Sequence, residues 1–336
     1  MLSFLILSCT KTTELDYSTA TPDKEQNACV AAEPGTYTRN APNMLLGVKV
    51  FTMEEDLQSL LSADEIKSKG LNTVSISFAI PYDEQGNLRY PFNPYGEQYS
   101  SIDDTVCRIG NLVHEMKSAG LSVYLSGEPH YYNPTSGEAP PRLTEFEDPS
   151  VITNFQSQVI PVMNALATMA EKYNVEYVAP ISEPDKYLGA EASDTLMQNI
   201  LPSFSSFQGK KVWQVYGEAF YELNIPQYRF HFSGYDTLGY AILGCDNPRY
   251  DWDGYISTLW TWAQEDGLQE AMHAEFGCVM QPSNQQTALD NFQYWYEQTA
   301  AYSKGVIVLD NPKSIPNSQT FSGSWVESWL TSLASQ

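Results

Sequence analysis

Two acidic tripeptides follow apolar runs that lie far apart in the chain. One run ends at Ser-Glu-Pro, residues 182–184, and a later one ends at Glu-Phe-Gly, residues 275–277. A glycosidic bond breaks through an oxocarbenium-like state, which needs a proton for the leaving oxygen and a negative group beneath the anomeric carbon. Two facing carboxylates meet both needs. Glu183 and Glu275 are therefore the candidate catalytic pair.

Apolar runs alternate with amphipathic helical stretches along most of the chain. The predicted strands are 45–51, 73–80, 122–125, 175–181, 211–215, 237–243, 270–274 and 305–309. Apolar residues recur at spacings of three and four in the predicted helices. These helices are 54–69, 103–119, 151–172, 194–207, 255–265, 286–300 and 324–334. The segment 220–230 is also predicted as a helix, with the weakest helical pattern. This alternation indicates parallel strands joined by right-handed crossovers.

Parallel strands of this kind form either a doubly wound sheet or a closed barrel. Eight units of about 35 residues favour the barrel. The first strand is followed by Thr-Met-Glu-Glu, not by the glycine-rich turn that opens a nucleotide-binding sheet. We predict an α/β chain with a single (β/α)8 TIM barrel over residues 41–336. Long loops at 81–101, 127–149 and 311–323 would build its active-site face.

The two tripeptides resemble the catalytic motifs of the largest clan of retaining glycoside hydrolases, clan A, whose barrels carry catalytic glutamates on strands four and seven. The resemblance implies that Glu183 is the general acid and then the base, and that Glu275 is the nucleophile. The chain spacing, 275 − 183 = 92 residues, matches three barrel units of about 30 residues.

Ser182 departs from the clan pattern, which has asparagine directly before the acid/base. That amide binds the sugar 2-hydroxyl, and serine is shorter with a single donor. Either the contact is made elsewhere, or the substrate presents this position differently. The resemblance also implies a tyrosine from strand six near the nucleophile, for which Tyr240 is the candidate, although a core tyrosine fits the same position.

Other residues at strand ends and in loops are candidates for binding substrate. They are Glu128, His130, Tyr131, Trp213, Glu218, Trp252 and Trp325. Each has an ordinary structural alternative, which is a salt bridge or loop anchor for the glutamates and packing for the rings. His273 precedes Glu275 by two residues and should share its side of the strand, in a lower layer of the barrel.

The chain is strongly acidic, with 18 Lys and Arg against 41 Asp and Glu and a net charge of −23 at pH 7. Such a surface repels phosphate backbones and anionic bilayers, which disfavours nucleic acid and direct membrane binding. The four histidines are scattered without metal-ligand spacing. We expect a monomer that binds a polysaccharide or oligosaccharide and needs no cofactor.

The first nine residues form an apolar run that ends in Cys9. The run resembles the lipobox of bacterial lipoproteins, which implies a lipid on Cys9 and a start codon further upstream. It is too short to span a bilayer. Residues 10–40 would form a flexible tether. We expect an exported protein, lipid-anchored at the cell surface or the periplasm-facing membrane; a short buried segment with an incidental cysteine is the alternative.

Four further cysteines permit disulfides in an exported protein. Cys29, Cys107, Cys245 and Cys278 allow three pairings, which the sequence does not distinguish. Cys245 and Cys278 would follow neighbouring strands and could pair there, and free buried thiols are the alternative.

These features predict retaining hydrolysis of a β-linked polysaccharide or oligosaccharide by double displacement, with the sugar, the linkage and endo or exo action left open. Serine at 182 favours one alternative, a non-catalytic carbohydrate-binding surface lipoprotein on the same barrel. A metal-dependent barrel hydrolase is disfavoured, because the first strand offers no His-x-His or carboxylate cluster.

Overall fold

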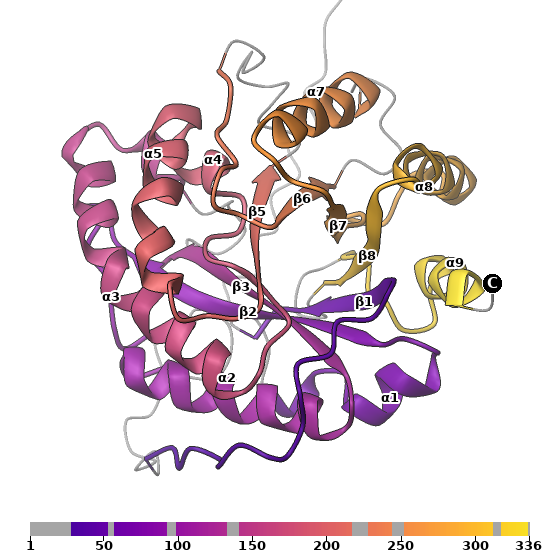
Figure 1. Ribbon diagram of the computed structural model, residues 1–336, viewed down its shortest axis with the longest axis horizontal. Coiled ribbons are helices and arrows are strands. Elements are labelled where there is room, and N and C mark those ends of the chain that lie inside the picture. The colour runs from indigo at the N-terminus through magenta and orange to yellow at the C-terminus, as the bar shows by residue number, and fades with distance from the viewer. Residues whose placement is uncertain are drawn as a thin grey trace, which may run out of the picture.

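A closed parallel barrel forms the centre of the molecule. The computed structural model describes residues 28–52, 57–92, 99–132, 141–216, 228–243, 252–311 and 317–334. Within these ranges eight strands pair in chain order, and the last pairs with the first (Figure 1). They are β1 Leu45–Val50, β2 Thr73–Tyr82, β3 Ser122–Tyr131, β4 Tyr177–Ala179, β5 Lys210–Tyr216, β6 Thr237–Ile242, β7 Ala271–Phe276 and β8 Ser303–Asp310. The predicted TIM barrel is confirmed.

Helices surround the strands. They are α1 Ala63–Ser68, α2 Ile102–Ser118, α3 Ser150–Lys172, α4 Pro184–Leu188, α5 Ala190–Ile200, α7 Trp252–Glu265, α8 Gln285–Thr299 and α9 Trp325–Ala334, with 3₁₀ turns at Leu57–Ser59, Leu143–Glu145 and Leu201–Phe204. None of the described helices is long and apolar enough to cross a membrane.

The predicted helix 54–69 begins too early. Ser62 accepts a hydrogen bond from the backbone of Glu65, and the Glu65 carboxylate accepts one from the backbone of Ser62. This capping box satisfies donors that a helix leaves unpaired at its start, so α1 begins at Ala63. The predicted helix 194–207 also differs, because α5 begins earlier, at Ala190, and ends at Ile200, where a 3₁₀ turn, Leu201–Phe204, follows.

Strands β2 and β3 extend beyond their predicted ends at 80 and 125. They pair in register from Thr73 with Ser122 up to Tyr82 with Tyr131. Residues 127–131, expected to belong to a loop, are therefore strand. Because side chains alternate between the two faces of a strand, this extension fixes which of them enter the barrel.

Two layers of apolar side chains hold the barrel together. A small cluster fills its interior, and a much larger one lies between strands and helices. Gly305, with φ of +127°, closes the ring, because a Cβ there would lie 2.0 Å from the carbonyl oxygen of Leu45 on β1. Only glycine permits that approach and that backbone angle together.

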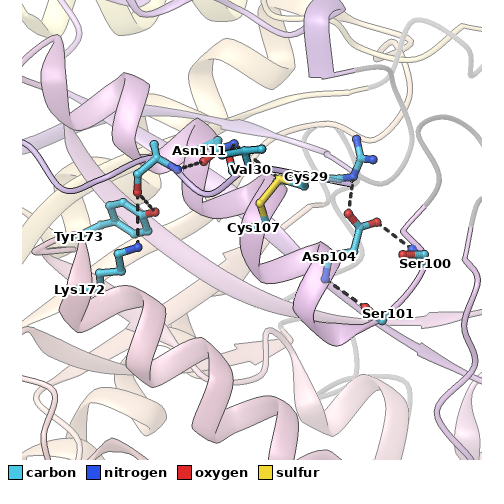
Figure 2. The surroundings of a disulfide bond; sticks show 11 residues. Cys29, Val30, Ser100, Ser101, Asp104, Cys107, Asn111, Lys172 and Tyr173 are labelled. Atoms are coloured by element: carbon cyan, nitrogen blue, oxygen red, sulfur yellow. Dashed lines mark hydrogen bonds and ion pairs between the residues drawn. A yellow bond between two sulfur atoms is a disulfide. The ribbon is translucent and has the colours of Figure 1, made fainter. Parts of the chain in front are cut away.

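The N-terminal segment from residue 28 lies on the outside of the barrel. A disulfide joins Cys29 to Cys107 on α2, and Asn111 accepts a hydrogen bond from the backbone of Ala32 and donates one to Val30 (Figure 2). The hydroxyl of Tyr173 donates to the carbonyl of Ala32. This part of the predicted tether is therefore attached to the barrel.

The same segment then reaches the amino end of the barrel. Arg39 donates to the carbonyl of Val175, 2.7 Å away, and the backbone of Asn40 donates to the Glu176 carboxylate. Glu176 is buried and also forms an ion pair with Lys117. The chain is thus fixed beside the start of β4 before it enters β1.

The structure bears only in part on the predictions for Cys278 and Cys9. Cys278 is disulfide-bonded, so it is not a free thiol. Its suggested partner, Cys245, lies outside the described residues, as do Cys9 and residues 10–27. The proposed pairing and the lipid site remain predictions.

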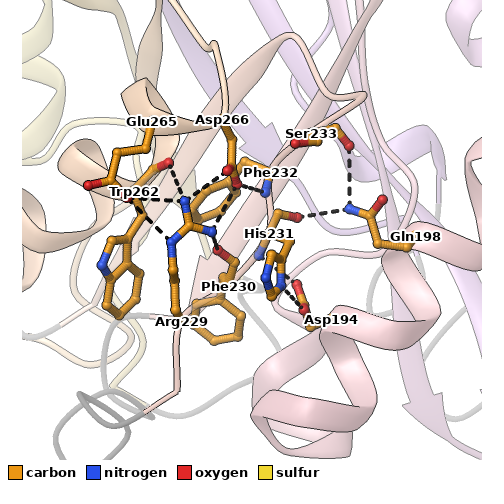
Figure 3. Close-up of polar contacts among 10 residues, drawn as sticks. All are labelled: Asp194, Gln198, Arg229, Phe230, His231, Phe232, Ser233, Trp262, Glu265 and Asp266. Carbon is orange, nitrogen blue, oxygen red and sulfur yellow. Dashed lines mark hydrogen bonds and ion pairs between the residues drawn. The ribbon is translucent and has the colours of Figure 1, made fainter.

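Residues 228–235 cross between α5 and α7 in non-helical conformation, so the described end of the weak predicted helix 220–230 is not helical. Figure 3 shows how the segment is held. Arg229 forms ion pairs with Glu265 and Asp266 at the end of α7. His231 contacts Asp194 on α5 through both its backbone and its ring. Side-chain contacts, not helical hydrogen bonds, position this approach to β6.

The Cys29–Cys107 bridge should stabilise the fold measurably. It closes a separation of 78 residues, and removing such a crosslink costs about 3 kcal/mol. We expect Cys29→Ser/Cys107→Ser to lower the free energy of unfolding by that amount in urea titrations. Asn111→Ala is the matched control, since it removes hydrogen bonds to the same segment and should cost about 1 kcal/mol. An unchanged midpoint in the double variant would contradict this role.

Candidate active site

A buried lysine lies at the centre of the polar cluster inside the barrel. Lys49 on β1 is 1% exposed, and its ammonium lies 2.5 Å from Glu128 on β3 and 2.6 Å from Glu275 on β7. Burial alone would lower the pKa of Lys49, but the charges of Glu128, Glu275 and Glu183 raise it above its ordinary value. All three carboxyl groups therefore act on one ammonium group.

Glu275 is held by donors on both oxygens. Lys49 binds Oε1, and the amide of Gln214 on β5 donates to Oε2 over 2.9 Å. The hydroxyl of Tyr124 on β3 donates to the Gln214 carbonyl oxygen over 2.6 Å, which fixes the direction of that amide. Donors on both oxygens fix the position of this carboxyl group.

An irregularity in β7 aims Glu275 into the barrel. Tyr240 on β6 pairs with His273, but the next residue, Ala241, pairs with Glu275, so Ala274 is an extra residue. Such a bulge changes the face to which the following side chains point. Ala274 belongs to the interior cluster and Glu275 contacts Lys49, so two consecutive residues face inward.

Glu183 lies at the end of the β4 segment in a left-handed backbone conformation, with φ of 50° and ψ of 46°. Such a conformation is uncommon for glutamate and often marks a functional site. The side chain is buried, and Lys186 on α4 donates to its Oε2 over 3.1 Å. Its Oε1 has no hydrogen-bond partner among the described residues.

The environment of Glu183 favours its protonated form. Burial is the largest cause and raises the pKa of this carboxyl well above its usual range. Lys186 and Lys49 oppose the shift, whereas the charges of Glu275 and Glu128 add to it. The charge of Glu275 thus acts on the carboxyl group of Glu183.

A glycine on β3 allows Glu183 to approach Glu128. A Cβ at Gly127 would lie 2.1 Å from the carbonyl oxygen of Pro180, and the Gly127 carbonyl accepts a hydrogen bond from the backbone of Ser182 over 2.7 Å. The chain that carries Glu183 therefore lies directly against β3.

Glu128 and Ser182, both predicted to bind substrate, border this cluster. Glu128 accepts from Lys49 and from the hydroxyl of Ser126. Burial, followed by the charge of Glu275, raises the pKa of Glu128, while Lys49 lowers it. Ser182 is fully buried, and its hydroxyl has no partner among the described residues.

Residues of α4 connect the site to β5. Asp185 is buried and accepts a hydrogen bond from the backbone of Tyr216, and burial raises the pKa of Asp185 to about 7. The ammonium of Lys186 lies 4.8 Å from the centre of the Tyr216 ring and 5.4 Å from that of Tyr187. These cation–π contacts help to stabilise Lys186 beside Glu183.

Two predicted site residues point away from the carboxylates. Tyr240 donates to the carbonyl of Ile256 and packs on Tyr255, both on α7. Trp213 is fully buried against the ring of Phe230. Both side chains lie in the layer between strands and helices. Side chains alternate between the two faces of a strand, and on β5 and β6 the residues adjacent to Trp213 and Tyr240 are the ones that face the barrel interior. The expectations of a tyrosine beside Glu275 and of a stacking platform at Trp213 are wrong.

His273 also faces outward. Its Nε2 lies 2.7 Å from the hydroxyl of Thr299 on α8, and its ring packs against Tyr240 and Phe276. The expectation that it shares the side of Glu275 fails because the extra residue, Ala274, interrupts the alternation of the strand.

The remaining candidates lie at the end of β3, at the start of α9 or outside the described residues. His130 at the end of β3 is buried, and burial lowers its pKa to about 4, so it is neutral at pH 7. Tyr131 is half-buried against Tyr82 and Phe146. Trp325 packs against Phe292, and its ring nitrogen donates to Gln319. Glu218 and the side chain of Trp252 lie outside the described residues.

Lys49, Gln214 and Lys186 were not among the predicted site residues, although the first two carry a signal in the sequence. Lys49 is the only charged residue in the apolar run 45–51, and Gln214 is a polar residue inside a predicted strand. A buried polar group must find a partner, so such positions indicate an interior network. Lys186 carries no comparable signal, because it follows the strand in what reads as a loop.

The cluster combines a carboxyl group with donors on both oxygens, Glu275, a carboxyl group whose pKa burial raises, Glu183, and two ammonium groups at the carboxyl edge of one barrel. This arrangement can donate a proton and stabilise a developing positive charge. Within the described residues, no group of three or more His, Cys, Asp and Glu side chains is arranged to hold a metal ion.

Comparisons with known proteins support the fold through structure alone. No family model matches the sequence, and no curated protein shows significant sequence similarity. A solved GH113 β-1,4-mannanase matches with 14% identity and a TM-score of 0.61 over 87% of this chain and 99% of its own. Endo-glycoceramidase II from a Rhodococcus species matches with 12% identity and a TM-score of 0.55, over 89% of this chain and 81% of its own. An endo-1,4-β-D-mannanase from Thermotoga petrophila matches with 10% identity and a TM-score of 0.56, over 87% of this chain and 99% of its own. The chain thus has the TIM-barrel fold found in these glycoside hydrolases.

Proposed function

We propose that this protein is a retaining glycoside hydrolase that cleaves a β-linked polysaccharide or oligosaccharide. The observation that carries the proposal is the contrast between two buried carboxyl groups in one cluster. Lys49 and Gln214 donate to the two oxygens of Glu275, an environment suited to a nucleophilic carboxylate, whereas burial raises the pKa of Glu183 well above its usual range and so favours its protonated form. A nucleophile and a general acid need these opposite states.

The first step uses both groups at once. Glu275 attacks the anomeric carbon while Glu183 gives its proton to the leaving oxygen, so that the glycosidic bond breaks and a glycosyl ester forms. Oε1 of Glu183 is the suitable donor, since Oε2 faces Lys186 and Oε1 has no described partner. In the second step Glu183 takes a proton from water, which displaces Glu275 from the sugar.

The charges of the site favour a neutral sugar. Lys49 and Lys186 are already paired with carboxyl groups, so neither is available to an acidic sugar. A net charge of −23 repels polyanions as well. Since the structural neighbours include mannanases and an endocellulase, oligosaccharides of β-1,4-mannan and cellulose are the first substrates to test. The Ser182 hydroxyl would donate to a sugar hydroxyl in place of the clan's amide.

Glu183→Gln and Glu275→Gln should each lower turnover at least about a thousandfold, because each removes one half of the acid and nucleophile pair. Reducing ends released from manno- and cello-oligosaccharides measure the loss, and thermal melting confirms that the variants fold. Turnover close to wild type in either variant would exclude that residue from the reaction.

The two roles can be separated by the leaving group. A 2,4-dinitrophenyl glycoside needs no proton to depart, so Glu183→Gln should still form the glycosyl-enzyme from it, whereas Glu275→Gln should not. Early proton NMR spectra of wild-type products should show the β-anomer first. An α-anomer first would mean inversion and would exclude a glycosyl ester on Glu275.

A non-catalytic sugar-binding role is the second candidate. Both oxygens of Glu275 accept hydrogen bonds in the free protein, which also suits a residue that only binds. This reading predicts that calorimetry detects binding of an oligosaccharide from which long incubation releases no reducing ends. Catalytic turnover in the wild type would exclude it.

The raised pKa of Glu183 predicts a pH-dependent cost to stability. The folded protein holds a proton that the unfolded chain releases above its pKa of about 4.3, so stability is lost as pH rises through the folded pKa. Glu183→Gln lacks this loss. The difference between its melting temperature and that of wild type should therefore grow in favour of the variant as pH rises above the unfolded pKa of about 4.3. The exposed control Glu191→Gln should keep a constant difference, and a constant difference for Glu183→Gln would contradict the protonated state.

We further propose that the protein is exported and anchored by a lipid on Cys9. The Cys29–Cys107 disulfide supports an oxidising compartment. In cells that express the complete gene, labelled palmitate should enter the protein, and Cys9→Ser should abolish the label. Absence of label from the unaltered protein would overturn the anchor without bearing on the reaction.

A further inference from the structure

Lys49 has two anionic partners, although one would satisfy its charge. Its ammonium lies 2.5 Å from Glu128 and 2.6 Å from Glu275, and all three side chains are almost completely buried. Glu128 accepts in addition from Ser126. An ion pair removed from water is costly unless its geometry and hydrogen bonds are good. The second carboxylate therefore needs an explanation.

We propose that Lys49 and Glu128 are positioning residues that hold Glu275 as a carboxylate and keep the charge of the site constant when Glu275 becomes a glycosyl ester, an inference that rests on the proposed function. Esterification removes the charge of Glu275. Lys49 would then be a buried ammonium without an anion, were Glu128 not in contact with it.

The summed charge of Lys49, Lys186, Glu128, Glu183 and Glu275 is the same in both chemical states. Before attack, with the proton on Glu183, the anions Glu128 and Glu275 match the cations Lys49 and Lys186. After attack, that proton has left with the sugar's leaving oxygen, so Glu128 and Glu183 are the anions and the sum over these five side chains is unchanged. Water then adds to the anomeric carbon, its proton returns to Glu183, and the ester bond to Glu275 breaks.

Each lysine has a partner in each state. Lys49 contacts Glu275 and Glu128 first, and Glu128 alone in the ester. Lys186 faces the protonated Glu183 first, supported by the rings of Tyr216 and Tyr187, and the ionised Glu183 afterwards. One negative charge thus moves from beside Lys49 to beside Lys186, and no buried cation is left unpaired.

Besides Glu183, Glu275 and Lys186, two titratable groups face Lys49 and Glu128, namely Tyr124 on β3 and Tyr187 on α4. Neither tyrosine changes charge during this exchange. Burial raises the pKa of Tyr187 to about 12 and that of Tyr124 well above its ordinary value, so both are neutral at working pH. Protonation of this region is therefore determined by the carboxyl groups.

The test compares Lys49→Met with the double variant Lys49→Met/Glu128→Gln. The single change leaves two facing carboxylates without their cation, and one of them should bind a proton near neutral pH. The acid limb of the kcat/KM profile should move up by about one pH unit or more. The double variant removes the unpaired carboxylate, so the limb should return toward wild type and kcat/KM should recover about tenfold. A structural role alone would produce no such rescue.

Glu128→Gln alone tests the ester state. Lys49 keeps Glu275 as an ion-pair partner in the free protein but has no carboxylate in contact with it when the ester forms. With a 2,4-dinitrophenyl glycoside, kcat/KM, which reports formation of the ester, should fall about a hundredfold, and the burst of released phenol should shrink. An unchanged burst would overturn the role of Glu128.

A matched pair controls for the loss of a buried ion pair as such. Lys117 and Glu176 form one at the amino end of the barrel, equally buried but away from the carboxyl edge. Lys117→Met and Lys117→Met/Glu176→Gln should lower the melting temperature and leave the pH profile unchanged. A shift of the acid limb in these variants as large as that in Lys49→Met would overturn the proposal.

Proton binding can be read without any turnover. Carbon-13 NMR of labelled glutamate carboxyls in wild type, Lys49→Met and the double variant should show one extra carboxyl protonated near pH 7 in the single variant only. If wild type cleaves no glycan, the proposed function fails, and this titration still decides whether Lys49 holds two carboxylates ionised. Identical titrations in all three proteins would overturn the inference, whatever the activity.

Discussion

The placement of one ammonium group inside an apolar barrel constrains the whole carboxyl end of this protein. Lys49 is 1% exposed, and a charge that far from water costs several kcal/mol unless it is paired. The partners must come from other strands, because neighbours on β1 point elsewhere or are apolar. Glu128 and Glu275 supply them from β3 and β7, and this requirement fixes the relative positions of the strands that carry the candidate chemistry.

The backbone departs from regular geometry where these partners require it. An extra residue in β7 turns Glu275 inward, a left-handed residue turns Glu183 toward the same cluster, and Gly127 leaves room for the chain between them. Such departures are costly and persist where surrounding contacts hold them. At the amino end, the buried pair of Lys117 and Glu176 attaches the N-terminal segment. The two ends of the barrel thus use buried ion pairs for different purposes.

The sequence predicts the barrel and the location of the two glutamates well, because both depend on local patterns. Apolar runs mark the strands, and residues directly after them must lie at one edge of a parallel barrel. It predicts inward and outward positions poorly. The extra residue at Ala274 places His273 on the opposite face of β7 from the expected one. Trp213 and Tyr240 were expected in the site, although the alternation of side chains along β5 and β6 places them on the outer face of the barrel. Lys49 could have been found as a charge in an apolar strand, whereas the contact of residues 28–40 with the barrel depends on a pairing of Cys29 that no local pattern specifies.

The central claim is that Glu275 and Glu183 act on the same sugar, the first as nucleophile and the second as acid. Activated 2-deoxy-2-fluoro glycosides form glycosyl esters that hydrolyse slowly, so they mark the nucleophile covalently. After incubation with the β-mannoside and β-cellobioside forms, mass spectrometry of the digested protein should show one fluorosugar on the peptide that contains Glu275, and none in Glu275→Gln. Label on Glu128 or on any other residue, or hydrolysis of the parent glycoside without label, would contradict it.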